Sequence, residues 1–330
     1  MAVIDDALSD VLRLVRLRAV VYFVRDMAPG WGMDIPVSVN GPLHMVLEGT
    51  CVLRVGGRDV ALSTGDAVLL PRGTAHAMLD DSNARPQPGP EVMRRLQVQP
   101  APMPPPDGSR SAVPQCAATG TRMLCGHFEW DGTLDHPLFA DLPQVIVVRN
   151  VSGREGGALF SMVVELITAE QRHTAPGAAA VADRMGEVLF VSLLRCWIAD
   201  HAPRRGVLAT MSDARLSRAL SHIHQNHAAS MDVRTLARVA GMSRTGFAVR
   251  FHALMGMPPR AYLTEWRMLQ ARRLLTRTDL ALGEIGESVG YGSHTGFGRA
   301  FKRRFGLTPA RLRREVGAET KSGVAPVRVG

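Results

Sequence analysis

The sequence predicts a multidomain α+β protein, with a β-barrel at the N-terminus, a helical linking region after it and an all-α domain at the C-terminus. Three observations lead to this prediction. Residues 19–70 hold short apolar and β-branched runs between Gly-containing turns, residues 158–199 show helical spacing, and residues 211–315 contain one pattern twice. A chain of 330 residues is also long for a single hydrophobic core.

The N-terminal part has the pattern of short strands and turns that is typical of a β-sandwich or β-barrel. Residues 7–17 carry apolar side chains at helical spacing, so a helix is expected before the strands. Strands are expected at residues 19–25, 43–47, 51–55, 60–62, 67–70, 121–130 and 145–149. Residues 83–120 contain nine prolines and few apolar side chains, which indicates a long loop.

An internal repeat organises the C-terminal part. Ser243, Phe247, Phe251, Gly256 and Pro259 each recur 50 positions later. Each copy reads as an apolar-faced helix, a Gly-containing turn and a second helix capped by Ser, which is the pattern of a helix-turn-helix. A helix expected over residues 260–277 joins the copies, and its apolar side would hold them at a fixed separation.

The charge of the chain is unevenly distributed. Residues 1–205 hold 19 Lys and Arg against 22 Asp and Glu, whereas residues 206–330 hold 20 against 8. A basic C-terminal part next to a slightly acidic N-terminal part is typical of a nucleic-acid-binding domain joined to a domain of another kind. The acidic N-terminus, the absence of a long apolar run and only four cysteines predict a cytoplasmic protein with reduced thiols and no membrane partner.

Two stretches resemble known families. The run from Gly290 to Arg314 resembles the most diagnostic segment of the AraC/XylS family of bacterial transcription regulators. Residues 65–76 resemble the second cupin motif, Gly-x5-Pro-x-Gly-x2-His, and residues 46–49 resemble the end of the first. The resemblance implies a sequence-specific DNA-binding regulator, more often an activator that recruits RNA polymerase than a repressor, with a cupin-like domain that senses an effector.

The expected domains follow from these motifs. They are a cupin-like sensor (1–155), a helical dimerisation region (156–202), a linker (203–212), an AraC-type double helix-turn-helix domain (213–316) and a disordered tail (317–330). In family members with a cupin sensor, helices in the region that corresponds to residues 156–202 form a homodimer interface. The corresponding face could also pack on the protein's own barrel. It comprises Val181, Met185, Val188, Leu189, Ser192 and Cys196.

The helix-turn-helix pattern also predicts which side chains face promoter DNA. The paired phenylalanines of each second helix must face inward, so the opposite face of that helix points outward. The expected base readers are Arg244, Thr245, Ala248, Val249, His294, Thr295, Gly298 and Arg299. Arg299 suits a guanine, whereas the small apolar residues of the first set suit thymine methyl groups. The phosphate candidates are Lys302, Arg303, Arg250, Arg304, Arg311, Arg313 and Arg314.

The barrel holds a candidate site of its own. His76 stands at the ligand position of the second cupin motif, and strand alternation would point His44 into the barrel. Cys125 could join them, with Cys116 and His127 as further candidates. Two imidazoles with one or two thiolates suit one Zn or Cu ion, and the same group suits a redox-sensing thiol. Alternatively, the histidines bond to backbone and the cysteine fills space in the core.

Two other functions fit parts of the sequence. One is a metal-dependent cupin enzyme fused to a DNA-binding domain. Pro42 replaces the usual first-motif Glu and no His-x-His occurs near residues 36–38, so we expect no enzyme activity. The other is a DNA-binding protein whose barrel is only structural. The sequence leaves the effector, the operator and the sign of regulation open.

Overall fold

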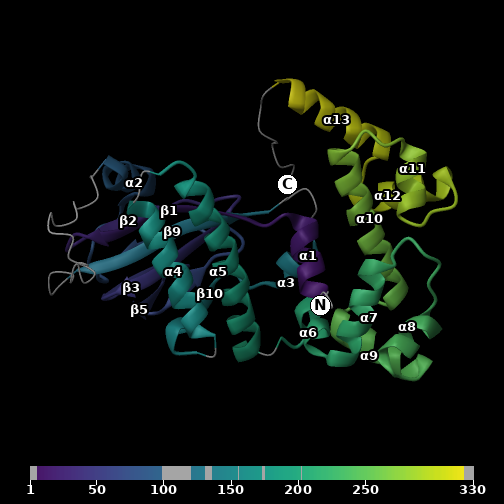
Figure 1. The fold of residues 1–330 in the computed structure, drawn as a ribbon, viewed down its shortest axis with the longest axis horizontal. Coiled ribbons are helices and arrows are strands. Elements are labelled where there is room, and N and C mark those ends of the chain that lie inside the picture. The colour runs from purple at the N-terminus through teal and green to yellow at the C-terminus, as the bar shows by residue number, and fades with distance from the viewer. Residues whose placement is uncertain are drawn as a thin grey trace. The chain divides into compact units, whose positions relative to one another are not determined.

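A computed structural model of the chain describes residues 6–98, 120–130, 136–154, 156–172, 175–201 and 203–322. The described residues fall into two compact units, which Figure 1 draws as ribbons. The barrel unit lies within residues 17–130 and 142–201, and the helical unit lies within residues 1–16, 131–141 and 202–330. Residues 6–16 and 136–141, which we expected in the sensor domain, therefore group with the C-terminal helices.

The barrel unit contains two five-stranded sheets. The first has the order β1-β9-β3-β6-β10, with the bounds Arg18–Met27, Thr121–Glu129, Gly41–Glu48, Ala67–Leu69 and Ile146–Val148. The second has the order β5-β4-β7-β2-β8, with the bounds Arg58–Ser63, Thr50–Val55, His76–Leu79, Gly32–Ile35 and Gln87–Pro88. Among the described strands only β2 and β8 pair in parallel.

Apolar side chains from both sheets form one core. Phe23 and Met123 come from the first sheet, and Leu53 and Met78 come from the second. Each is at most 1% exposed, so the alternation of the strands directs one face of each sheet inward. The predicted barrel class is confirmed. The short strands β2, β7 and β8 were not predicted, because two to four residues are too few for alternation to register.

Helices accompany the sheets in the barrel unit. α2 (Gly89–Val98) lies where the sequence predicted only a loop. η1 (Val151–Gly153) precedes α4 (Gly157–Arg172), and α5 (Ala178–His201) packs against β1 and β10. The approach to β1 is close, because a Cβ atom added to Gly186 would lie 2.6 Å from the Cβ of Ala19. Asp183 accepts a hydrogen bond from the N–H of Val21 at 3.1 Å and ties α5 to the strand.

Ten helices make up the described part of the helical unit. Their bounds are α1 (Ala7–Val15), α3 (Pro137–Asp141), α6 (Gly206–Ser212), α7 (Ala214–Gln225), α8 (Val233–Ala240), α9 (Arg244–Met255), α10 (Pro259–Arg277), α11 (Leu282–Ser288), α12 (His294–Phe305) and α13 (Pro309–Ser322). We call α7–α9 the first lobe and α11–α13 the second lobe. α10 packs against both lobes and is about 28 Å long.

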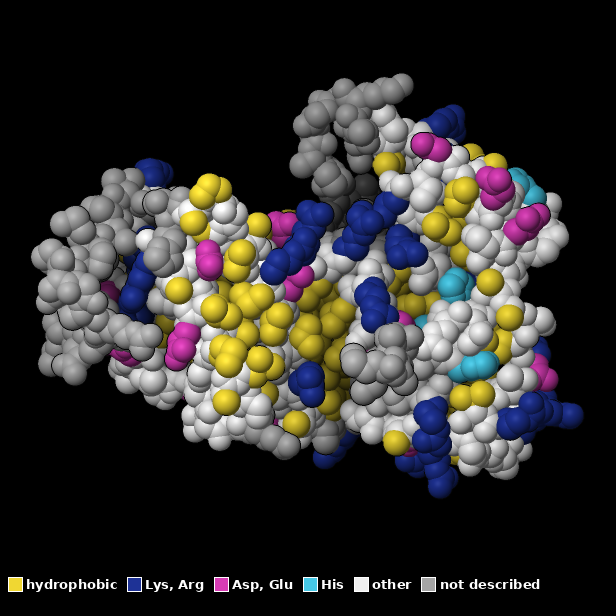
Figure 2. Space-filling view, in the orientation of Figure 1, with side chains coloured by type: hydrophobic (Ala, Val, Ile, Leu, Met, Phe, Trp, Pro, Cys, Tyr) yellow, Lys and Arg dark blue, Asp and Glu magenta, His cyan; other side chains and the backbone are white. Residues whose placement is uncertain are grey.

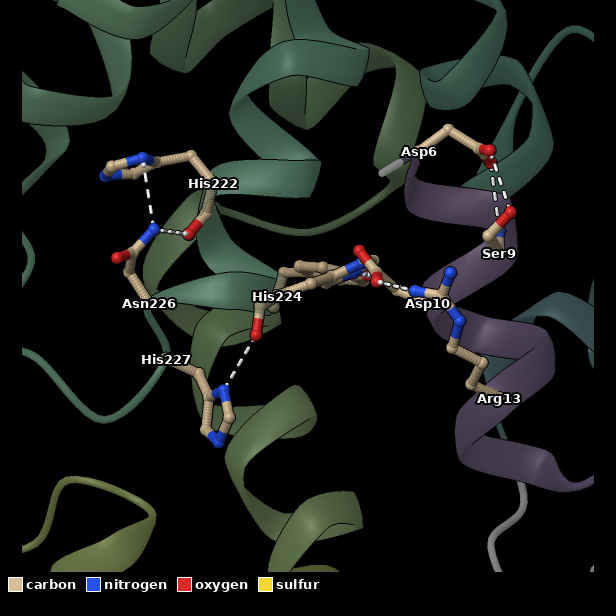
Figure 3. Close-up of polar contacts among 9 residues, drawn as sticks. Asp6, Ser9, Asp10, Arg13, His222, His224, Asn226 and His227 are labelled. Atoms are coloured by element: carbon tan, nitrogen blue, oxygen red, sulfur yellow. Dashed lines mark hydrogen bonds and ion pairs between the residues drawn. The ribbon is translucent and has the colours of Figure 1, made fainter. Parts of the chain in front are cut away.

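α1 belongs to the core of the helical unit because it packs on α7. His224 of α7 donates from Nδ1 to Asp10 of α1 at 3.3 Å (Figure 3). Its Nε2 atom accepts from the hydroxyl of Tyr262 at 2.8 Å, and its ring stacks on Trp266 at 3.6 Å. Burial is the largest cause that lowers the pKa of His224, so the ring stays neutral with one donor and one acceptor.

Residues 136–141 also contribute buried side chains to the core of the helical unit. The His136 ring meets Trp266 edge-on at 5.9 Å, and burial lowers the pKa of His136 to about 3. In the same segment, Asp141 accepts from the N–H of Val207 at 2.8 Å and so caps the start of α6. α6 occupies most of residues 203–212, which we expected to be an open linker, and its Val207 and Leu208 are buried.

The end of the helical unit also differs from the prediction. α13 continues to Ser322, past the expected domain end at residue 316, and residues 323–330 lie outside the described part of the chain. None of the helices in the described ranges is long and apolar enough to cross a membrane.

Candidate nucleic-acid interface and buried histidine cluster

The two lobes are built from the same local signals. In the first, Asp232 caps α8 by accepting from the N–H of Thr235 at 2.7 Å, and Gly241 caps the end of α8 with φ 65°. Ser243 then caps α9 by accepting from the N–H of Gly246 at 3.1 Å. In the second lobe, Ser293 caps α12 in the same way at 3.1 Å. The predicted repeat of a helix, a turn and a Ser-capped helix is thus present twice.

A pair of phenylalanines fixes the orientation of each Ser-capped helix. Phe247 and Phe251 of α9 lie 5.5 Å apart by ring centroids, and Phe297 and Phe301 of α12 lie 5.9 Å apart. All four side chains are at most 1% exposed. Residues four apart share one helix face, so burial of the pair turns the opposite face of each helix outward. The predicted inward positions are confirmed.

The residues expected to read DNA lie on these outward faces. Arg244, Thr245, Val249, His294, Thr295, Arg299, Lys302 and Arg303 are exposed, and Ala248 and Gly298 are partly exposed. Within the described residues, the four cationic side chains of this set make no ion pair or hydrogen bond, so they are free to meet an anion. A Cβ atom added to Gly298 would meet nothing within 4 Å, so the surface there is open to a base pair.

Several other arginines that we expected to bind phosphates have partners within the protein. Arg250 pairs with Asp213 at 2.6 Å, and Arg304 pairs with Glu265 at 2.6 Å. Arg311 pairs with Glu315 at 2.7 Å. The guanidinium of Arg313 donates to the carbonyl of Leu280 at 2.6 Å. These partners lie 4 to 39 residues away in sequence, and only the fold shows which of them meet. Lys302, Arg303 and Arg314 remain as the exposed phosphate candidates.

The barrel brings together the three side chains that motif and alternation selected. His44 on β3 stands directly opposite Cys125 on β9, and His76 reaches them from the second sheet. Nδ1 of His44 lies 3.2 Å from the sulfur of Cys125, and Nε2 of His44 lies 2.8 Å from Nε2 of His76. Each of the three residues is at most 4% exposed.

The hydrogen-bond partners fix the protonation state of this cluster. Nδ1 of His76 lies 2.8 Å from the carbonyl oxygen of Thr74, which can only accept, so this nitrogen carries a proton. Burial lowers the pKa of His76 and lowers that of His44 well below its usual value, so both rings are neutral. Nε2 of His76 therefore accepts from Nε2 of His44, and Nδ1 of His44 accepts from Cys125. Burial raises the pKa of Cys125, which keeps it a thiol.

The same geometry limits how the cluster could hold a metal. Cys125 and His76 lie at opposite edges of the His44 ring, so the three donor atoms do not converge on one point. No group of three or more potential ligands in the described ranges is arranged to hold an ion. His127 bonds to Glu129 at 2.8 Å and contacts the ring of Tyr22, and Cys116 lies outside the described residues. The carbonyl of Thr74, which determines the tautomers, has no signal in the sequence.

Comparisons with known proteins cover both parts of the chain. The family model described as Cupin matches residues 6–199, and the family model described as Helix-turn-helix domain matches residues 236–315.

Relatives along most of the chain are named as regulators. The chain is 29% identical to an AraC-like transcription regulator of Streptomyces antibioticus, over 94% of this chain and 98% of that one. It is 26% identical to the HTH-type transcriptional regulator AlkR of Acinetobacter baylyi, over 94% and 99%. Among solved structures, the DNA-binding domain of AdpA in complex with a target DNA is 33% identical, with a TM-score of 0.31, over 32% of this chain and 95% of that one.

Proposed function

Since the chain belongs to the AraC family of DNA-binding transcription regulators that carry an N-terminal cupin domain, we propose that both of its lobes read one operator under the control of an effector sensed in the barrel. The observation that carries this proposal is the matched pair of helices α9 and α12. Each buries two phenylalanines and turns unpaired polar or small side chains outward. Such helices enter adjacent major grooves of DNA.

The two helices present different chemical groups to the DNA bases. On α12, Arg299 can bond two acceptors of a guanine, and His294 and Thr295 lie one turn earlier, near the helix start. On α9, Ala248 and Val249 offer methyl groups to thymines, with Arg244 and Thr245 beside them. Lys302 and Arg303 supply phosphate contacts, which hold the protein on DNA without reading sequence.

The buried cluster is the proposed input, through a metal ion, an oxidant or another small molecule. One Zn or Cu ion would be held by the imidazoles of His44 and His76, whose Nε2 atoms face each other. Cys125, which contacts the other ring nitrogen of His44, would support this ligand rather than bind the ion. A further ligand would have to come from water or from movement of Cys125.

A homodimer is the proposed assembly. Figure 2 shows hydrophobic side chains gathered over α4 and α5, and Leu159, Met162 and Leu166 of α4 are 45–57% exposed. They lie at the i, i+3 and i+7 positions of one helix face. On α5, Val181 is exposed, whereas Leu189 is buried and belongs to the protein's own core. A second copy of the chain fits this face because apolar patches of matching shape bury each other across a twofold axis.

Activation of transcription through contact with RNA polymerase is the proposed output, following the commoner behaviour of the family. The absence of the first-motif Glu and His-x-His in the barrel speaks against a cupin enzyme fused to a DNA-binding domain, and we therefore propose a regulator without catalytic activity.

Replacing Arg299 and Arg303 separates base reading from phosphate contact. Arg299→Ala should cost about 1–3 kcal/mol of binding to an operator selected from random duplexes, with little change on scrambled DNA. Arg303→Ala should weaken binding to both duplexes alike. Fluorescence anisotropy at one fixed salt concentration measures these affinities. An equal loss on both duplexes for Arg299→Ala would remove its role as a base reader.

Metal content tests the proposed input. We expect the reduced, tag-free chain to hold about one Zn or Cu ion, measured by mass spectrometry of the metals. His76→Ala should abolish this binding, and Cys125→Ser should weaken it by about 10–100-fold, as an outer partner of a ligand does. His127→Ala is the matched control and should leave it unchanged. A metal-free wild-type chain after titration with either ion would refute the metal input and leave an oxidant or an organic ligand.

A charge placed on the α4 face tests the homodimer. Met162→Asp should shift the chain from dimer to monomer in sedimentation equilibrium, because the carboxylate would be buried in an apolar contact. Val37→Asp, at a position that is 76% exposed in the loop after β2, is the matched control. A monomeric wild-type chain at micromolar concentration, or a dimer that Met162→Asp leaves intact, would contradict the proposed interface.

A further inference from the structure

One guanidinium connects the two lobes of the helical unit. Arg267 lies in the middle of α10 and donates from Nε to the carbonyl of His227 at 2.6 Å and from Nη2 to that of Ala229 at 2.9 Å. Both carbonyls belong to the loop that follows α7 in the first lobe. Nη1 of the same side chain donates to the carbonyl of Gly290 at 3.2 Å, in the turn before α12. One planar group thus bonds to the backbone of both lobes.

The lobes meet closely at this point. Gly290 has φ +83°, and a Cβ atom added there would lie 2.5 Å from the carbonyl oxygen of Ala228 and 2.7 Å from Nη2 of Arg267. Only a residue without a side chain allows this approach and this backbone conformation at once. The ring of Tyr291, the next residue, lies 5.8 Å from the guanidinium carbon. The turn of the second lobe is therefore held against both the arginine and the loop of the first.

The chemistry of this contact requires arginine. The guanidinium is planar and offers five N–H donors in a fixed fork, which here reach three carbonyls in different directions. A lysine at the same place keeps the charge but has a single nitrogen, which cannot reach both lobes with the same geometry. The guanidinium is occupied by carbonyl oxygens and partly buried, so it is not placed as a phosphate contact.

We propose that Arg267 is a positioning residue for DNA recognition, which fixes the distance and angle between α9 and α12 so that both enter the grooves of one operator together. This inference rests on the proposed function, because it needs both lobes to bind the same DNA. α10 holds each lobe by apolar packing on its own side, and this packing supplies no directed bond from one lobe to the other. The bonds of Arg267 to both lobes, and the contact at Gly290, oppose that tilt. The second lobe binds intramolecularly because one chain carries both lobes, and these contacts define the geometry at which it does so.

The test compares Arg267→Lys in the full chain with the wild type and with Arg260→Lys, an exposed position on the same helix. The probes are an operator selected by the wild-type chain, duplexes with its two half-sites moved by one or two base pairs, and each half-site alone. We expect Arg267→Lys to bind the selected operator about tenfold more weakly and to lose the preference for its spacing, with half-site affinities and the salt dependence unchanged. Gly290→Ala should act in the same direction, and Arg260→Lys should behave as the wild type.

Three other outcomes would overturn the proposed role of Arg267. If Arg267→Lys keeps the wild-type spacing preference, the inference is overturned. If it loses half-site binding together with its thermal unfolding transition, Arg267 only holds the fold, and the inference is likewise overturned. If the wild-type chain selects no operator at all, the proposed function fails and the inference fails with it.

Discussion

Burial of two phenylalanines on one face of each Ser-capped helix is the constraint on which the rest of the helical unit depends. Phe247 and Phe251 anchor α9, and Phe297 and Phe301 anchor α12, at exposures of at most 1%. Because exposing each buried ring to water would cost about 1.5–3 kcal/mol, the opposite faces of both helices are held toward solvent. The polar and small side chains on these faces are exposed or partly exposed as a result of this packing.

The helical unit takes its core from three separate stretches of the chain. Asp10 of α1 bonds to His224, and His136 packs on Trp266, so segments that precede and interrupt the barrel sequence stabilise the α10 region. The chain therefore passes between the units several times rather than through one linker. Both His136 and His224 are kept neutral by burial. The chain crosses between the barrel unit and the helical unit next to α1, α3 and α6.

The sequence predicted the features that depend on periodicity and repetition. The offset of 50 residues located both lobes, and i, i+4 spacing identified the buried phenylalanines. Alternation and one motif were enough to bring His44, His76 and Cys125 together. Features set by tertiary contact could not be predicted. The tautomers of the cluster depend on the carbonyl of Thr74, and the bonds that remove Arg250 and Arg304 from the phosphate candidates depend on partners 37 and 39 residues away. α6 escaped prediction because seven residues show too little of a helical period.

A hydroxyl-radical footprint of the full chain on its selected operator, with the mass of the complex measured in parallel, tests the central claim most directly. If α9 and α12 of one chain read DNA together, each bound chain protects two windows on one face of the duplex, about one helical turn apart. One protected window for each bound chain would contradict the account. It would mean that only one of the two lobes binds the operator.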